Sequence, residues 1–333
     1  MQDSGSKLRA FCLNSARFVK HRRGTLQAYQ HGNHVIMNLL SPLQQSYERR
    51  LIRVTQYLHA HLDQPLDLQT LADLACMSPY HWHRIYQGIH GESVIATLKR
   101  LRMQKAAALL LHTSTAVKEI AVQVGYPNLQ SFTRTFTQTY GTPPARFREA
   151  GVAPVLPDAA QMQTHYPVRL CDQPSQQLIQ LAHQGSYMEI GRAFDVLNAC
   201  AGQRGWIAPD TEWIGIYPDD PVITPEADLQ SFAAISVHES QQTALPAGFT
   251  TRQLPAGTYA VLRYQGPYSA MQPVYQWFCG QWLPASGYEV AAYPPFEKYL
   301  NNPRQTAPAD LLTDIYLLLN PVSEDAKSEG KSS

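Results

Sequence analysis

The sequence predicts two domains of different class: an all-α domain with two helix-turn-helix units, followed by an α+β domain made of two pseudo-symmetric strand-helix-strand-strand repeats. Apolar residues recur at helix spacing from about Gln44 to Arg148. Beyond residue 165 the pattern changes to strand-like runs separated by single helices, and one such pattern occurs twice. At 333 residues the chain is long enough for both domains.

The formal charge divides along the same boundary. Residues 1–46 hold 6 Lys and Arg against 1 acidic residue, residues 47–150 hold 12 against 7, and residues 151–333 hold 9 against 18. A basic first half favours a polyanionic partner, whereas an acidic second half favours a neutral or cationic one. The alternative is that these modest charges serve solubility alone.

Three segments are predicted to lie outside the domains, which then cover residues 44–149 and 165–321. Residues 1–40 form a flexible basic leader without a secretory h-region, and Met37 is an alternative translation start. Residues 150–164 have the composition of a linker, and residues 322–333 that of a disordered tail. The chain has no apolar run long enough to span a membrane, and its five scattered cysteines suit a reducing cytoplasm.

The first predicted helix-turn-helix unit covers residues 68–90. Asp67 is a natural N-cap for "LQTLADLACM", and Ser78 followed by Pro79 is a typical start for the helix "YHWHRIYQGIHG". This second helix has one apolar and one polar face. Its apolar residues are Trp82, Ile85 and Tyr86, and its polar residues near the N-terminal end are Tyr80, His83 and Arg84.

The second predicted unit covers residues 116–140. Gly125 ends its first helix, Asn128 caps the helix "LQSFTRTFTQTYG", and Gly141 ends that helix. Core-facing aromatic residues recur every fourth position, which leaves a separate polar face. The aromatic residues are Phe132, Phe136 and Tyr140, and the polar ones are Gln130, Ser131, Arg134 and Thr135.

Both polar sets suit the reading of DNA bases. The N-terminal part of a recognition helix meets base edges in the major groove, where Arg recognises guanine and Gln recognises adenine. The long predicted helix "SVIATLKRLRMQKAAALLLHT" joins the units and spans ~30 Å. Since successive major-groove faces lie about 34 Å apart, one monomer could place both helices in adjacent grooves without dimerising.

Several motifs in this half resemble the DNA-binding domain of the AraC/XylS family. They are the "GES" between the two units, the closing "GTPPARFR", and the residues Arg102, Ala106, Leu109, Leu110, Ile120, Ala121, Gly125, Tyr126, Phe132, Arg134 and Phe136. The resemblance implies an all-α DNA-binding domain of a transcription regulator. It assigns base contacts to Tyr80, His83 and Arg84 in the first unit and to Gln130, Ser131 and Arg134 in the second. Family members often have Trp in place of Tyr80 and Gln in place of His83.

Other interpretations of these residues stay open. Arg134 could contact a phosphate instead of a base, because more than half of protein–DNA hydrogen bonds go to the backbone. His81 and His83, together with His59 and His61, could suggest a metal site, but no Cys or carboxylate set accompanies them. The sequence therefore predicts neither a metal nor a cofactor.

The second half contains the internal repeat. The stretch 181–205 aligns with 262–287, and each copy has a strand, a Gln-Gly-x-Tyr turn, an amphipathic helix and a glycine exit. Each copy continues into two further strand-like runs: "TEWIGIY" and "LQSFAAISV" in the first, "PPFEKYL" and "LLTDIYLLL" in the second. Two such units predict an α+β domain with pseudo-two-fold symmetry.

A carboxylate stands in an unusual place in the second copy. Alternation along "PPFEKYL" puts Phe296 and Leu300 on one face, predicted to be the core under the helices, and Glu297 and Tyr299 on the other. In the first copy Gly215 occupies the equivalent position to Glu297, flanked by Trp213 and Tyr217. A pseudo-two-fold axis would bring the carboxylate opposite the glycine, between aromatic walls. Because burial of a carboxylate is costly and aromatic faces attract cations, this arrangement suits a flat lipophilic cation.

This half resembles the GyrI-like effector-binding domains, which also form the drug-binding part of some multidrug-responsive regulators. The resemblance is carried by the turns at Gly185-x-Tyr187 and Gly266-x-Tyr268, by 215–225, by 254–268 and by "PPFEKYLNN". It implies that Glu297 contacts the effector. Tyr299, Trp213, Tyr217, Tyr187 and Tyr268 are the other candidate pocket residues.

Three functions remain as alternatives at this point. The first is a cytoplasmic transcription regulator, not an enzyme, that binds double-stranded DNA and a small lipophilic or cationic effector. The second is a small-molecule hydrolase with Glu297 as general base and Tyr187 or Tyr268 as donors. The third is a module that binds a protein such as RNA polymerase and takes no ligand. Separately, the alternative to a pocket at Glu297 is a pair with Lys298 or Arg263 on a solvated sheet face.

Overall fold

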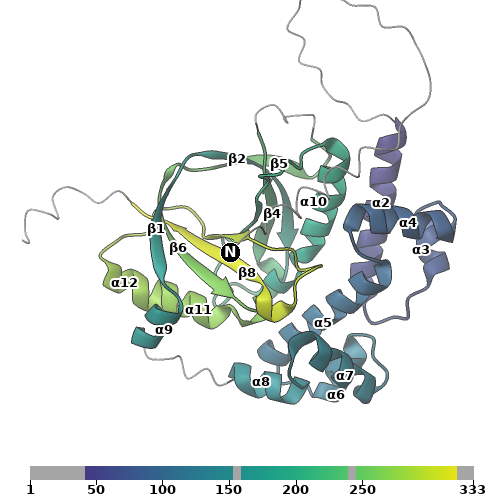
Figure 1. Cartoon of the computed structure of the whole chain (residues 1–333), viewed down its shortest axis with the longest axis horizontal. Helices are drawn as coiled ribbons and strands as arrows, with labels where there is room; N and C mark the ends of the chain where they lie inside the picture. The colour runs from purple at the N-terminus through teal and green to yellow at the C-terminus, as the bar shows by residue number, and fades with distance from the viewer. Residues whose placement is uncertain (1–41, 153–158, 239–244, 321–333) are drawn as a thin grey trace, which may run out of the picture.

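The computed structural model describes residues 42–152, 159–238 and 245–320, and the predicted leader, residues 153–158 of the predicted linker and the predicted tail lie outside these ranges. A helical domain (α2–α8) is followed by a sheet domain (α9–β8), and the two lie against each other (Figure 1). The helical domain contains seven helices within these ranges. They are α2 (Pro42–Ala60), α3 (Leu68–Leu74), α4 (Pro79–His90), α5 (Val94–His112), α6 (Val117–Gln123), α7 (Leu129–Tyr140) and α8 (Pro144–Val152).

The predicted helix ends in the helical domain are confirmed. The Asp67 carboxylate accepts from the backbone N–H groups of Gln69 and Thr70 at the start of α3. At the start of α7 the Asn128 side chain accepts from the N–H groups of Gln130 and Ser131. Gly125 and Gly141 follow α6 and α7 with positive φ angles of 78° and 73°, a region that glycine occupies without steric cost.

Each helix-turn-helix unit packs around its own apolar cluster. Trp82 and Tyr86 of α4 contact Val54, Leu58 and Leu71, and the Trp82 indole donates to the Leu71 carbonyl. Phe132 and Phe136 of α7 are fully buried against α5 and α6, and the Tyr140 hydroxyl donates to the Met103 carbonyl of α5. These contacts bury the apolar faces that the sequence predicts, and α5 joins the units over ~28 Å.

The sheet domain contains one curved sheet in the order β1-β6-β8-β7-β3-β4-β2-β5, with antiparallel pairing throughout. Outward from the central β3–β7 pair, the order is β4, β2, β5 on one side and β8, β6, β1 on the other. The strands are β1 (Val168–Gln173), β2 (Gln176–Gln184), β3 (Trp213–Ile216), β4 (Gln230–Ser236), β5 (Phe249–Leu254), β6 (Gly257–Gln265), β7 (Phe296–Tyr299) and β8 (Leu312–Leu318). The outermost strands, β1 and β5, lie outside the two stretches of sequence that align as a repeat.

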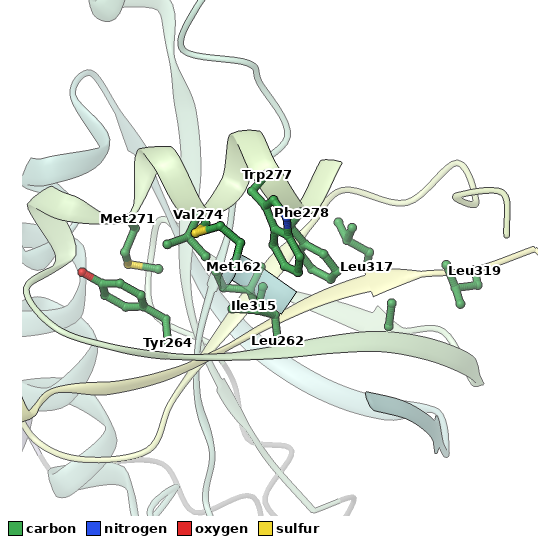
Figure 2. Packing of buried hydrophobic residues seen from close by; sticks show 11 residues of the cluster. Met162, Leu262, Tyr264, Met271, Val274, Trp277, Phe278, Ile315, Leu317 and Leu319 are labelled. Carbon is green, nitrogen blue, oxygen red and sulfur yellow. The ribbon is translucent and has the colours of Figure 1, made fainter. Parts of the chain in front are cut away.

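Two main helices cover one face of the sheet. They are α10 (Gly191–Arg204) and α11 (Gln272–Trp277), and the latter continues through a π-helical turn, η6 (Phe278–Trp282), into α12 (Leu283–Ser286). Each follows a short 3₁₀ turn, η2 (Tyr187–Glu189) or η5 (Tyr268–Ala270), and two further turns, η3 (Glu226–Asp228) and η7 (Pro308–Asp310), precede β4 and β8. Trp277 and Phe278 pack on Leu262, Ile315 and Leu317 of β6 and β8 (Figure 2).

The segment 150–164 is not an irregular linker over its whole length. Helix α8 extends to Val152, and α9 (Ala159–His165) is a further helix. Met162 is 3% exposed and packs into the cluster under α11 (Figure 2). One buried apolar residue in a seven-residue helix leaves no periodicity, so a tertiary contact stabilises an element that the sequence pattern does not predict.

Candidate functional site

Glu297 lies at the centre of the sheet, directly opposite Gly215. In the antiparallel β3–β7 pair, Gly215 pairs with Glu297 and Trp213 pairs with Tyr299. The Glu297 side of β7 faces α10 and α11, since Tyr275 of α11 and Phe194 of α10 contact Glu297 and Tyr299. The carboxylate is therefore placed beneath the helices, where the sequence pattern places Phe296 and Leu300.

The predicted orientation of Phe296 and Leu300 is thus wrong. Phe296 is buried on the opposite sheet face, where it packs against Tyr259 and stacks on Tyr316. Leu300 lies just after β7 and is 44% exposed. The sheet is curved, so that residues of β2 and β6 pack in one cluster on the face opposite the helices. Both faces of the sheet are therefore buried. For this reason the alternation of residues along a strand does not identify which face lies under the helices.

Hydroxyl groups surround the Glu297 carboxylate. Tyr275 donates to Oε1 at 2.8 Å and Tyr299 donates to Oε2 at 2.9 Å. The Tyr217 and Tyr299 hydroxyl oxygens lie 2.5 Å apart. Since the Tyr299 hydrogen goes to Glu297, Tyr217 donates to Tyr299 and extends the chain of hydrogen bonds. Glu297 itself is 6% exposed.

Aromatic rings from both halves of the sheet domain enclose this group. Tyr187 packs edge-on against Tyr217 with ring centroids 4.9 Å apart. Tyr268 and Phe194 each contact the Tyr299 ring at 5.4 Å. We call the assembly the Glu297 site; it consists of Glu297, Tyr187, Phe194, Trp213, Gly215, Tyr217, Tyr268, Tyr275 and Tyr299.

Burial dominates the electrostatics of the Glu297 site. It raises the pKa of Glu297 from 4.5 to about 7, against the opposing effect of hydrogen bonds from Tyr275 and Tyr299. Burial and the nearby Glu297 carboxylate together raise the pKa values of Tyr275 and Tyr299 well above 10. The hydroxyls therefore remain donors, and Glu297 changes charge near neutral pH.

The ion pairs predicted by the solvated-face alternative are not formed. Lys298 points to the opposite sheet face and donates to Glu212 at 2.7 Å. Arg263 donates to both oxygens of Asp314. Among the residues that the structure describes, no Lys, Arg or His forms an ion pair with Glu297. The site holds a carboxylate whose hydrogen bonds come from tyrosines.

The structure brings together all six candidate pocket residues of the sequence analysis and adds two others, Tyr275 and Phe194. Tyr275 lies on α11 and Phe194 lies on α10, and both helices pack on the sheet. The sequence does not separate the contacts of these two side chains at the Glu297 site from ordinary helix-core packing. The only available signal for Tyr275 is its place seven residues after Tyr268, on the helix face that returns to the sheet.

The candidate DNA-reading residues lie on the second helix of each unit. On α4, Arg84 is exposed and His83 is half-buried, and the Tyr80 side chain lies outside the described part of the structure. On α7, Gln130 and Arg134 are exposed and Ser131 is half-buried, with its hydroxyl donating to the Asn128 carbonyl. The exposed groups are therefore accessible to a partner.

Two further properties concern the described residues alone. They contain no group of three or more His, Cys, Asp or Glu side chains arranged to hold a metal ion. No helix among them combines the length and apolar character needed to cross a membrane.

Two family models match the chain in separate segments. One, described as a GyrI-like small molecule binding domain, matches residues 166–320, and the other, described as a helix-turn-helix domain, matches residues 71–150. The two segments correspond to the sheet domain and to most of the helical domain.

Curated relatives match part of the chain. The bifunctional transcriptional activator/DNA repair enzyme AdaA of Bacillus subtilis (strain 168) is 34% identical over 96 residues, which is 29% of this chain and 46% of that protein. The right origin-binding protein of Escherichia coli (strain K12) is 33% identical over 94 residues, 28% of this chain and 32% of that protein. The matched stretch thus spans less than half the length of either relative.

Solved structures also match parts of the chain. The C-terminal domain of AraT, a response regulator from Geobacillus stearothermophilus, is 32% identical, covers 36% of this chain and 93% of that chain, and has a TM-score of 0.30. The EcmrR C-terminal domain is 17% identical, covers 47% of this chain and 99% of that chain, and has a TM-score of 0.39.

Proposed function

We propose that this chain is a transcription regulator of the AraC/XylS type, in which the GyrI-like sheet domain senses a lipophilic cation at the Glu297 site and the helical domain binds double-stranded DNA. The observation that carries the proposal is the Glu297 carboxylate, which is 6% exposed, enclosed by aromatic rings and without a cationic partner among the described residues. A buried carboxylate of this kind favours a cation that can also pack on the rings.

The antiparallel pairing of β3 with β7 supports the shape of this pocket. One copy supplies Glu297 and Tyr299, and the other supplies Gly215 at the paired position, with Trp213 and Tyr217 beside it. A lipophilic cation between the two halves would contact the carboxylate on one side and aromatic rings on both. Its charge would stabilise ionised Glu297 and lower the raised pKa of this group.

On the helical domain we propose that Tyr80, His83 and Arg84 of α4 and Gln130, Ser131 and Arg134 of α7 contact base edges. The separation of the units along α5 supports binding of one monomer to adjacent major-groove segments. The net positive charge of residues 47–150 supports binding to the DNA backbone. Contact with RNA polymerase is a further partner proposal.

Titration with tetraphenylphosphonium, followed by tryptophan fluorescence, tests the sensing proposal. We expect the wild-type protein to bind this cation, Glu297→Gln to bind it at least tenfold more weakly, and both to ignore an uncharged analogue such as tetraphenylmethane presented in detergent. The exposed substitution Glu289→Gln is the matched control and should bind as the wild type does. Equal binding by the wild type and Glu297→Gln would remove Glu297 as the receptor.

One observation favours a second function, a hydrolase. A pKa of about 7 is the range in which a carboxylate works as a general base at neutral pH. Turnover of activated esters or epoxides that is abolished by Glu297→Gln would support this function. Binding of the cation without turnover would support the sensing function instead.

A further inference from the structure

The helical and sheet domains share a buried interface along α2 and α10, which lie side by side (Figure 1). Ile52 of α2 packs against the apolar cluster of the sheet domain. Glu48 of α2 accepts two hydrogen bonds from Arg204 of α10, at 3.1 and 2.9 Å, and both side chains are at most 12% exposed. These contacts between side chains hold the two domains in one defined arrangement.

Arg304 crosses this interface from the sheet domain. It lies in the loop after β7, seven residues beyond Glu297. Its guanidinium forms ion pairs with Asp195 of α10 and with Glu92, the latter at 3.3 Å, and donates to the His90 carbonyl at the end of α4. The side chain is 12% exposed. The strand that carries the candidate effector carboxylate thus leads directly to the first helix-turn-helix unit.

Two further residues of the helical domain complete this contact. His59 of α2 lies 2.9 Å from Asp195, and Arg100 of α5 pairs with Glu92 at 2.6 Å. We call these residues the interdomain ion network; they are His59, Glu92, Arg100, Asp195 and Arg304. Two buried carboxylates are matched by two guanidinium groups, so removal of one partner leaves a buried charge uncompensated.

Helix α5 also lies against the two turns that carry tyrosines of the Glu297 site. It contacts both η2 and η5, the turns that begin with Tyr187 and Tyr268. Arg100 is close enough to Tyr268 for its charge to oppose the strong increase in the pKa of Tyr268 that burial causes. In Figure 1, α5 lies between the sheet domain and helices α6, α7 and α8.

The Glu297 site is filled by its own side chains in this arrangement. Both carboxylate oxygens accept tyrosine hydroxyls. A single Cβ added at Gly215 would lie 2.6 Å from the Tyr299 hydroxyl and 2.7 Å from that of Tyr217. A molecule can reach Glu297 only after some of these tyrosines move, and Tyr187 and Tyr268 belong to turns against which α5 packs.

We propose that α5 of the helical domain is a lid over the Glu297 site, and that the interdomain ion network holds this lid closed. This inference rests on the proposed function, in which the site takes a lipophilic cation. Effector entry moves η2 and η5 away from α5, and β7 carries the movement to Arg304. Because coupling between two equilibria is reciprocal, whatever weakens the ion network strengthens effector binding, and the bound effector weakens domain docking.

The replacement Arg304→Met tests this lid. It removes the guanidinium that joins Asp195, Glu92 and the His90 carbonyl and keeps an unbranched apolar stem. We expect Arg304→Met to bind tetraphenylphosphonium about tenfold more tightly than the wild type. Arg304→Lys keeps the charge but cannot reach all three partners at once, so we expect its affinity for tetraphenylphosphonium to lie between those of the wild type and Arg304→Met. If Arg304→Met does not fold, Arg304→Lys is the variant that tests the lid. The matched control is Arg263→Met, which removes an Arg–Asp pair within the sheet domain and should bind as the wild type does.

Amide hydrogen exchange measures the lid without any ligand. We expect Arg304→Met to lose protection in α5, η2 and η5 relative to Arg263→Met, while β6 and β8 keep theirs. Affinity and protection equal to those of the control would overturn the lid, even if the wild type binds the cation and Glu297→Gln does not. If no variant binds the cation, the sensing proposal fails, and unchanged protection in Arg304→Met would then overturn the lid as well.

Discussion

Gly215 pairs directly with Glu297 across the central strands β3 and β7. Glycine is the only residue type that leaves room here for the hydroxyls around the carboxylate. A Cβ at this position would approach the Tyr299 and Tyr217 oxygens to 2.6 and 2.7 Å. Glycine is therefore present here for space, since its backbone has no positive φ angle. The pairing therefore places a glycine of the first repeat directly beside the Glu297 carboxylate of the second.

The substitution Gly215→Ala should destabilise the protein by ~1–3 kcal/mol, because the Tyr217 and Tyr299 hydroxyls must leave their positions beside Glu297. It should also weaken tetraphenylphosphonium binding. Urea unfolding and fluorescence titration measure the two effects. Gly202→Ala on α10 is the control, since a Cβ there contacts nothing within 4 Å and alanine is the better helix former. Equal stability of the two variants would show that the Tyr217 and Tyr299 hydroxyls can move away from Glu297 without lowering the free energy of unfolding.

The raised pKa of Glu297 predicts a pH-dependent stability. The folded chain keeps a proton on Glu297 up to about pH 7, whereas the unfolded chain releases it near 4.5. The free energy of unfolding should therefore fall as pH rises from 4.5 to 7, by on the order of 3 kcal/mol from this group. Glu297→Gln removes the titration, so it should be more stable than the wild type at pH 8 and similar at pH 5.

Urea unfolding at the two pH values measures this difference. The exposed substitution Glu289→Gln should change stability little at either pH. A Glu297→Gln variant that differs from the wild type by the same amount at pH 5 and pH 8 would contradict a raised pKa at this position.

Tyr275 should set the pH range in which a cation binds. Its hydroxyl stabilises the ionised form of Glu297, so Tyr275→Phe should raise the pKa of this group further, by ~1 pH unit. Cation binding requires ionised Glu297, and its pH midpoint should move upward by the same amount. Fluorescence titration from pH 5.5 to 9 measures the shift. The control is Tyr259→Phe, whose hydroxyl donates to the Pro255 carbonyl on the other sheet face, and its midpoint should not move.

Local signals in the sequence were sufficient for much of this architecture. Asp67 and Asn128 cap helices because Asp and Asn side chains accept from N–H groups two or three residues ahead, which is a property of neighbouring residues alone. The pairing of Gly215 with Glu297 followed from aligning two copies of one pattern. Both inferences need no knowledge of how the domains pack.

Contacts between distant segments were beyond the sequence. Arg304 meets Asp195 across 109 positions and the His90 carbonyl across 214, and nothing around Arg304 distinguishes it from a solvated loop residue. The face on which Phe296 packs depends on curvature that arises only when the whole sheet is assembled. Tyr275 is hidden within an amphipathic helix for the same reason, since only the tertiary fold brings it to Glu297.

Arg134 and Arg84 provide a test of how the helical domain recognises DNA. Both are exposed, and each is the sixth residue of the second helix of its unit. If Arg134 reads a base, Arg134→Ala should lose ~1–3 kcal/mol of affinity for DNA selected by the wild-type protein from a random pool and should lose less on a scrambled duplex. If it contacts a phosphate, both duplexes should lose equally, and the slope of log K against log salt should fall by about 1. We expect the first result for Arg134 and for Arg84.

Arg169→Ala removes an exposed cation of the sheet domain and controls for net charge. Wild-type behaviour of both Arg134→Ala and Arg84→Ala on selected DNA would mean that neither helix reads the sequence through its arginine.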